Sequence, residues 1–144
     1  MKFLFLFLFA ITSFKSLSAD EVNTTLYTGT INNRAITLYL NQQPNPCGGE
    51  TGFLYQGIYQ YGKGKNWIEL EISDNGKGNF CMTEFRFTGV LILKKEGALL
   101  TGLWISPDGK TQFPVSLKKQ VLSLKTKAEM EQNLERTHYS NHDC

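Results

Sequence analysis

Residues 53–72 read FLYQGIYQYGKGKNWIELEI, two runs of alternating character on either side of a glycine-containing turn. In the first run, aromatic residues occupy every second position from Phe53 to Tyr61 except Gly57. In the second run, isoleucine and leucine alternate with glutamate. Alternation with a period of two is the pattern of a β-strand that has one face on a core and the other in water. This stretch therefore predicts a β-hairpin.

The same period recurs along the chain, for example at residues 36–40 and 113–117. Asparagine and glycine provide the positive φ that hairpins need, and proline presets φ for a turn. Such residues separate the alternating runs at Asn32-Asn33, Asp74-Asn75-Gly76, Glu96-Gly97 and Ser106-Pro107-Asp108-Gly109. Short strands with a turn about every 10 residues are typical of an antiparallel meander. The sequence predicts an all-β fold of about eight strands that forms a small barrel or a strongly curved sheet.

Glycines inside these runs point to curvature. A glycine within a strand weakens it unless it marks a bulge, a sharp bend or a close approach of another group. Each glycine ends a similar three-residue stretch, namely Tyr27-Thr28-Gly29, Tyr55-Gln56-Gly57, Phe87-Thr88-Gly89 and Leu100-Thr101-Gly102. We expect bends of the sheet at these four positions, with neighbouring aromatic rings covering the glycines.

Met1–Ala19 has the organisation of a signal peptide. Lys2 precedes an apolar run at residues 3–11, and small residues lead up to Ala19. The apolar run is shorter than the roughly 20 residues that span a bilayer, so we expect no membrane span. We expect export to the periplasm or the medium, with a signal peptide over 1–19, a barrel-like domain over 20–119 and a C-terminal helix or tail over 120–144.

The charge balance bears on the class of partner. The chain has 15 Lys and Arg against 13 Asp and Glu. Two of the basic residues, Lys2 and Lys15, belong to the leader, so the mature chain is formally neutral. Recognition of nucleic acid needs a basic face, and we therefore expect no nucleic-acid partner.

The C-terminal segment has a different pattern. Thr126–Glu129 fits a capping box and predicts a short helix over residues 128–136. Met130 and Leu134 lie one helical turn apart on this helix. Two apolar side chains make a weak stripe, so the helix is expected to be marginal unless it packs on the barrel.

The two histidines of the chain, His138 and His142, follow this segment. On a helix they would share a face, as zinc ligands often do. Chain termini usually fray, however, and we expect a solvated tail with neither a metal nor a cofactor. A catalytic triad needs a base held against its nucleophile by a third group, and no such motif accompanies these histidines.

Two further sets of charged residues share strand faces. Glu69 and Glu71 lie roughly 6–7 Å apart at Cα, a spacing that a glycosidase acid–base pair could use. A simpler interpretation is that both glutamates lie on the solvent-facing side of an alternating strand. Glu84 and Arg86 are expected to form a surface ion pair. We therefore predict that the protein is not an enzyme.

Export would expose Cys47, Cys81 and Cys144 to an oxidising compartment, where cysteines pair. Three is an odd number, so one thiol is left over or joins another chain. We favour a disulfide between Cys47 and Cys81. The alternative is a disulfide that holds the tail through Cys144.

The strand register decides the role of the aromatic row. If Tyr61 pairs with Asn66 across the turn, Tyr59 faces Ile68 and the aromatic rings form core. If Tyr61 pairs with Trp67, the rings lie outside as a binding patch, because a shift of one residue reverses the faces of a strand. The core arrangement is favoured, and the sequence leaves both open.

Short motifs across residues 27–119 resemble those of small exported β-proteins of Gram-negative bacteria: Tyr27-x-Gly-x-Ile31, Ile36-x-Leu-x-Leu40, Gly57-x-Tyr-x-Tyr61, Gly102-x-Trp104 and Phe113-Pro-x-x-Leu117. In size, compartment and cysteine use, the chain is similar to periplasmic lysozyme inhibitors and to immunity proteins that neutralise cell-wall-degrading toxins. This resemblance implies a non-catalytic binding protein whose partner is a peptidoglycan hydrolase or a toxin.

We expect the loop Asn41–Glu50 to carry the partner contacts, because its prolines reduce the ordering cost of binding. The candidate partner-binding residues are Asn45, Pro46 and Glu50 in this loop, together with Tyr59, Tyr61 and Trp67 if the register exposes them. The alternative function is a lipocalin-like carrier, since an eight-stranded barrel can hold one small apolar ligand.

Overall fold

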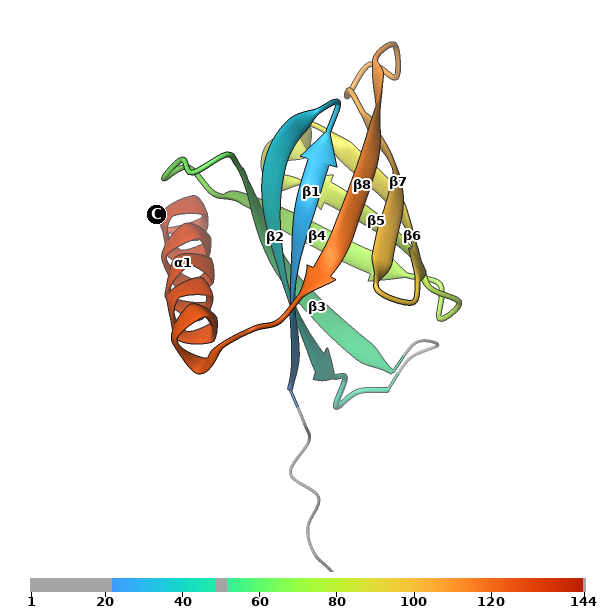
Figure 1. Ribbon diagram of the computed structural model, residues 1–144. Helices are drawn as coiled ribbons and strands as arrows, with labels where there is room; N and C mark the ends of the chain where they lie inside the picture. The colour runs from blue at the N-terminus through green and yellow to red at the C-terminus, as the bar shows by residue number, and fades with distance from the viewer. Residues whose placement is uncertain (1–21, 49–51, 144) are drawn as a thin grey trace, which may run out of the picture.

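The computed structural model describes residues 22–48 and 52–143. Each strand pairs antiparallel with the next, and β8 pairs with β1, so the sheet closes into a barrel (Figure 1). The predicted all-β barrel is confirmed. The strands are β1 (Asn23–Ile31), β2 (Arg34–Pro44), β3 (Phe53–Tyr61), β4 (Ile68–Asp74), β5 (Asn79–Glu84), β6 (Val90–Glu96), β7 (Leu99–Ile105) and β8 (Gln112–Gln120), followed by the helix α1 (Leu124–His142). The leader Met1–Ala19, Glu50 and Cys144 lie outside the described residues.

Large apolar side chains fill the middle of the barrel. They come from alternate strand positions, as the period of two predicts. Burying a side chain of this size stabilises the fold by about 1.5–3 kcal/mol. Exposed fractions of 0–1% are found for inward-facing residues of five strands: Leu38, Tyr59, Met82, Leu91 and Leu100.

The register of β3 against β4 settles the position of the aromatic row. Tyr59 lies opposite Ile68, and its side chain is 1% exposed. The rings of Tyr55 and Tyr61 also pack against the core. The second register, in which Tyr61 pairs with Trp67, does not occur. Tyr59 is therefore a core residue, and its assignment as a surface contact is wrong.

The four glycines lie where another group comes very close, three of them within strands and Gly89 just before β6. A Cβ atom at Gly29 would stand 2.0 Å from the carbonyl oxygen of Ser116, across the β1–β8 pairing. A Cβ atom at Gly102 would stand 2.0 Å from the carbonyl oxygen of Ile92. Side chains come closer than 3 Å to the Cβ positions of the other two, Gly57 and Gly89. These glycines allow the close approaches that the curved sheet requires.

Helix α1 is longer than the sequence predicts. It begins after Ser123, whose hydroxyl accepts a hydrogen bond from the backbone N–H of Thr126 at 3.1 Å. The prediction of a cap at Thr126 is therefore wrong by one turn, because the earlier serine serves as the N-cap. The helix continues to His142, so the tail histidines are helical.

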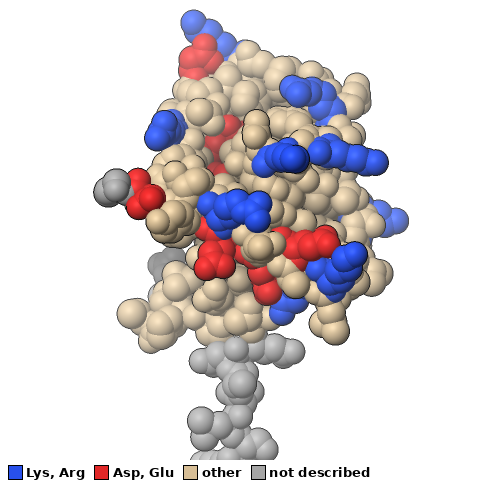
Figure 2. Space-filling model, turned by 90° about the vertical axis from the view of Figure 1, so that its left-hand side faces the viewer, with Lys and Arg blue, Asp and Glu red and all other residues tan. Residues whose placement is uncertain are grey.

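A second apolar cluster holds α1 on the outer wall of the barrel (Figure 1). Leu134 is 8% exposed and packs against Leu26, Tyr39 and Ile58. Figure 2 views this side and shows acidic and basic side chains intermixed over it. In the described part of the chain, no helix is long and apolar enough to cross a bilayer.

The predicted disulfide between Cys47 and Cys81 is wrong, because both thiols are free. Cys81 lies between two inward-facing residues of β5, Phe80 and Met82, so its own side chain points out of the barrel wall. Cys47 is exposed in the turn that follows β2, at one end of the barrel. The alternative through Cys144 falls outside the described residues.

We predict that the Gly29→Ala and Gly102→Ala variants each lose at least about 2 kcal/mol of unfolding free energy, because the added methyl group collides with a backbone oxygen. Gly64→Ala is the control, since its nearest atom is 3.3 Å from the new Cβ. Urea unfolding followed by circular dichroism measures all three. Equal stability of the strand variants and the control would contradict the close approach.

Candidate functional site

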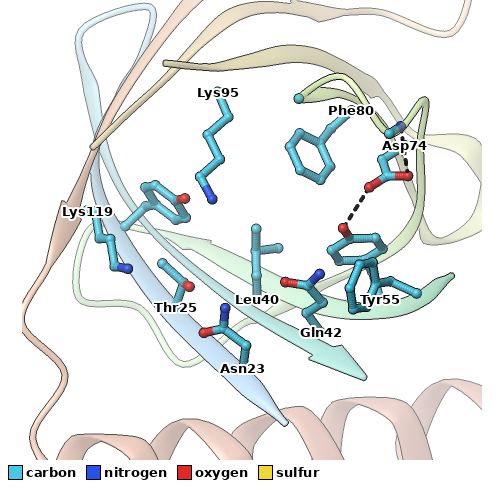
Figure 3. A pocket seen from close by; sticks show the side chains of 13 residues that line it. Asn23, Thr25, Leu40, Gln42, Tyr55, Asp74, Phe80, Lys95 and Lys119 are labelled. Atoms are coloured by element: carbon cyan, nitrogen blue, oxygen red, sulfur yellow. Dashed lines mark hydrogen bonds between the residues drawn. The ribbon is translucent and has the colours of Figure 1, made fainter. Parts of the chain in front are cut away.

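One end of the barrel opens into a pocket. In an antiparallel meander the turns alternate between the two ends, so the connections after β2, β4 and β6 meet at the same end. The pocket there has a volume of about 270 Å³. Its lining comes from seven strands and the β4–β5 turn (Figure 3): Asn23, Thr25, Tyr27, Leu40, Gln42, Phe53, Tyr55, Asp74, Gly76, Gly78, Phe80, Lys95 and Lys119. We call this pocket the mouth.

Two lysines enter the mouth from β6 and β8, the two neighbours of β7 in the closed sheet. Lys95 continues the inward-facing row of Leu91 and Leu93 on β6, and Lys119 continues that of Leu117 on β8. Figure 3 shows both ammonium groups among the other lining side chains. The salt bridges found among the described residues involve other lysines, so no described carboxylate neutralises these two charges in a salt bridge.

The acidic residue of the mouth, Asp74, is engaged by neighbours. The hydroxyl of Tyr55 donates to its Oδ2 at 2.6 Å, and the backbone N–H of Gly76 donates to its Oδ1 at 3.3 Å. Burial, together with the hydrogen bond to Asp74 and the charge of that carboxylate, raises the pKa of Tyr55 far above its usual value. Tyr55 thus remains a neutral donor, and the mouth keeps two positive charges against one negative charge.

The opposite end of the barrel is closed around a buried carboxylate. Glu84, at the end of β5, is 4% exposed. The indole Nε1–H of Trp104 donates to its Oε1 at 2.6 Å, and the hydroxyl of Tyr59 donates to the same oxygen. The hydroxyl of Thr88 donates to its Oε2 at 2.7 Å. A buried carboxylate needs such donors, because burying an unpaired charge is very unfavourable.

The expected surface ion pair between Glu84 and Arg86 is therefore wrong. Glu84 is in phase with the inward-facing residues Phe80 and Met82, so its carboxylate points into the barrel. Arg86 lies in the short 3-10 helix η1 (Phe85–Phe87), and its guanidinium lies 5.4 Å from the ring centre of Phe85. Its backbone has a φ of 62°, which turns the chain sharply across this end.

The structure does not bring the predicted partner-binding residues together. Asn45 is half-buried and Pro46 exposed, and both follow β2 at the rim of the mouth. Tyr61 lies at the opposite end, with the guanidinium of Arg34 at 4.4 Å from its ring centre. Trp67 is half-buried and packs against the cluster under α1. Asn45 and Pro46 are thus the predicted contacts that border the mouth.

Sequence reasoning missed the lysines of the mouth, although a signal was present. Lys95 and Lys119 each fall on the inward phase of an alternating strand, where an apolar residue is expected. A charged residue in that phase near a strand end marks an end of the barrel, where its charge either meets water or is surrounded by hydrogen-bond donors. Glu84 carries the same signal at the other end.

Comparison of the chain with protein-family models, with curated proteins and with solved structures found no match. Its function has to be argued from the geometry of the site.

We predict that Trp104→Phe lowers the unfolding free energy by about 1–3 kcal/mol, because it removes one donor from the buried Glu84 carboxylate. Trp67→Phe is the matched control, since that indole lies in the cluster under α1. Urea unfolding at neutral pH compares the two variants. An equal loss of unfolding free energy in both variants would mean that only the smaller ring matters and that the hydrogen bond to Glu84 adds no stability.

The same network predicts a loss of stability in alkali. Burial, the hydrogen bond to Glu84 and the charge of Glu84 raise the pKa of Tyr59 far above the ordinary tyrosine value of about 10. The folded protein keeps this proton while the unfolded chain loses it, so stability falls as pH rises above about 10.

Each tyrosine that keeps its proton only in the folded protein lowers the free energy of unfolding by about 1.4 kcal/mol per pH unit above pH 10. Urea midpoints between pH 9 and pH 11 should fall less steeply for Tyr59→Phe than for the wild type. If the urea midpoints of the two proteins fell equally steeply with pH, Tyr59 would not be the group that keeps its proton in the folded state.

Proposed function

We propose that this protein is a non-catalytic exported binding protein whose mouth binds and inhibits a cell-wall-degrading enzyme. The observation that carries the proposal is the pair of lysines in the mouth, Lys95 and Lys119, whose charges no described carboxylate neutralises through a salt bridge. A protein partner with an anionic surface complements them.

The chemistry of glycoside cleavage supplies such a surface. Glycosidases hold two carboxyl groups at the bond they cleave, so a peptidoglycan glycosidase has acidic groups in its cleft. Complementary charges speed the encounter and fix the orientation of the two proteins. We therefore favour a muramidase among the cell-wall-degrading enzymes.

The turn at residues 45–48, on the rim of the mouth, offers a second set of contacts to the partner. Asn45 organises it, because its side-chain oxygen accepts from the N–H of Cys47 at 3.1 Å and its amide donates to the carbonyl of Gly48. Pro46 adds a further restraint on the backbone. A turn ordered in this way loses little entropy on binding.

The proposed location agrees with this target. The leader Met1–Ala19 would deliver the chain to the periplasm or the medium, where peptidoglycan hydrolases meet their substrate. A protein held there can protect the cell wall from such an enzyme.

The alternative of an apolar-ligand carrier has less support. The middle of the barrel is filled by buried side chains, among them Tyr59, Met82 and Leu91. The pocket that remains at the mouth includes two lysines and an aspartate, which an apolar ligand would have to desolvate. The carrier function remains a prediction from the sequence.

We predict that the purified protein lowers the rate at which a muramidase clears a peptidoglycan suspension, with a plateau near equimolar inhibitor. The double variant Lys95→Glu/Lys119→Glu should weaken this inhibition by about 10-fold or more, because it places like charges against the acidic cleft.

The matched control is Lys94→Glu/Lys118→Glu, which makes the same change at the adjacent exposed positions outside the mouth. It should inhibit within about 2-fold of wild type, since Lys94 and Lys118 fall on the outward phase of their strands and do not line the mouth. Circular dichroism checks that both variants fold. Absence of inhibition by the wild type, or equal loss in both double variants, would contradict the proposal.

A further inference from the structure

Three metal-ligating side chains converge on the outer wall of the barrel, away from the mouth. Glu69 lies on β4, and His138 and His142 lie near the end of α1. The histidines are four residues apart, so they share one face of the helix. That face is the one that lies against β4, because both rings reach the Glu69 carboxylate.

The distances suit a single ion. Nδ1 of His138 is 2.5 Å from Oε1 of Glu69, and Nε2 of His142 is 3.3 Å from Oε2. The three candidate ligand atoms lie within 4.8 Å of one another. Ligand atoms around a tetrahedral zinc ion are about 3.3 Å apart, so small rotations of exposed side chains bring all three into place.

Neighbouring groups hold the site in position. Nδ2 of Asn141 donates to Oε2 of Glu69 at 2.7 Å. The ring of Phe85 packs edge-on against His142, with the ring centres 5.1 Å apart. Groups that orient the ligands in this way are typical of metal sites. The Glu69 side chain is 12% exposed and those of the histidines about half exposed, so an ion can enter from solvent.

We propose that Glu69, His138 and His142 bind a zinc-class divalent metal ion. Two imidazole nitrogens and one carboxylate oxygen are donors that Zn²⁺ accepts, and three protein ligands leave a fourth position for water. The ion joins the end of α1 to β4 and adds to the apolar contacts that Leu134 and Met130 make with the barrel. This site is separate from the mouth and does not depend on the proposed inhibition.

Titration of the purified protein with ZnCl₂ by calorimetry tests the site, and Co²⁺ serves as a spectroscopic probe. We expect one ion per chain, visible-region bands of nitrogen- and oxygen-coordinated Co²⁺, and a higher thermal midpoint when Zn²⁺ is added, because the folded state alone holds the ligands together. His138→Ala and Glu69→Gln should each weaken binding at least about 10-fold.

Glu71→Gln is the matched control, because Glu71 is an exposed glutamate on the same face of β4. Its affinity for Zn²⁺ should equal that of the wild type. Circular dichroism establishes that each variant is folded. The proposal is overturned if the wild type binds no ion, if Glu69→Gln and His138→Ala bind as tightly as Glu71→Gln, or if Co²⁺ shows the intense near-ultraviolet band of a cysteine ligand.

Discussion

The pairing of β1 with β8 closes the sheet, and the other features of the molecule depend on that closure. A strongly curved sheet requires close approach of neighbouring backbones, and Gly29 permits it where β1 meets β8. Closure pairs the two outer strands, which would otherwise be open edges. It also gives every strand an inner and an outer face, so that alternate residues form either the core or the wall.

Closure also creates two ends with opposite chemistry. At one end, hydrogen-bond donors surround the buried carboxylate of Glu84, and the chain turns across it. At the other end, Lys95 and Lys119 bring positive charge to a pocket that water can reach. Because the middle of the barrel is filled, no passage for a large ligand connects these ends in the described structure. We therefore propose the mouth as the recognition site, while the outer wall carries α1 and the cluster around Glu69.

Local pattern was enough to predict the strands, their turns and the strand glycines, because these depend on period and on backbone conformation. Pairings between distant residues could not be predicted in the same way. The disulfide was predicted from the oxidising compartment alone, whereas in the structure Cys47 and Cys81 are both free. The contact between Glu69 and His138 spans 69 residues and depends on where Leu134 docks. The sequence shows that Lys95 falls on the inward phase of its strand. That it lines a pocket follows only from the structure, which shows where the barrel ends.

Hydrogen exchange of the protein with and without a muramidase tests the proposed inhibition most directly, because it locates the contact on one end of the barrel. The account predicts slower amide exchange around the mouth, at residues 42–48, 74–78 and 95–98. Amides at residues 32–33, 85–89 and 106–111 at the closed end should exchange unchanged. Protection confined to the closed end or to α1 would show that the mouth is not the binding site.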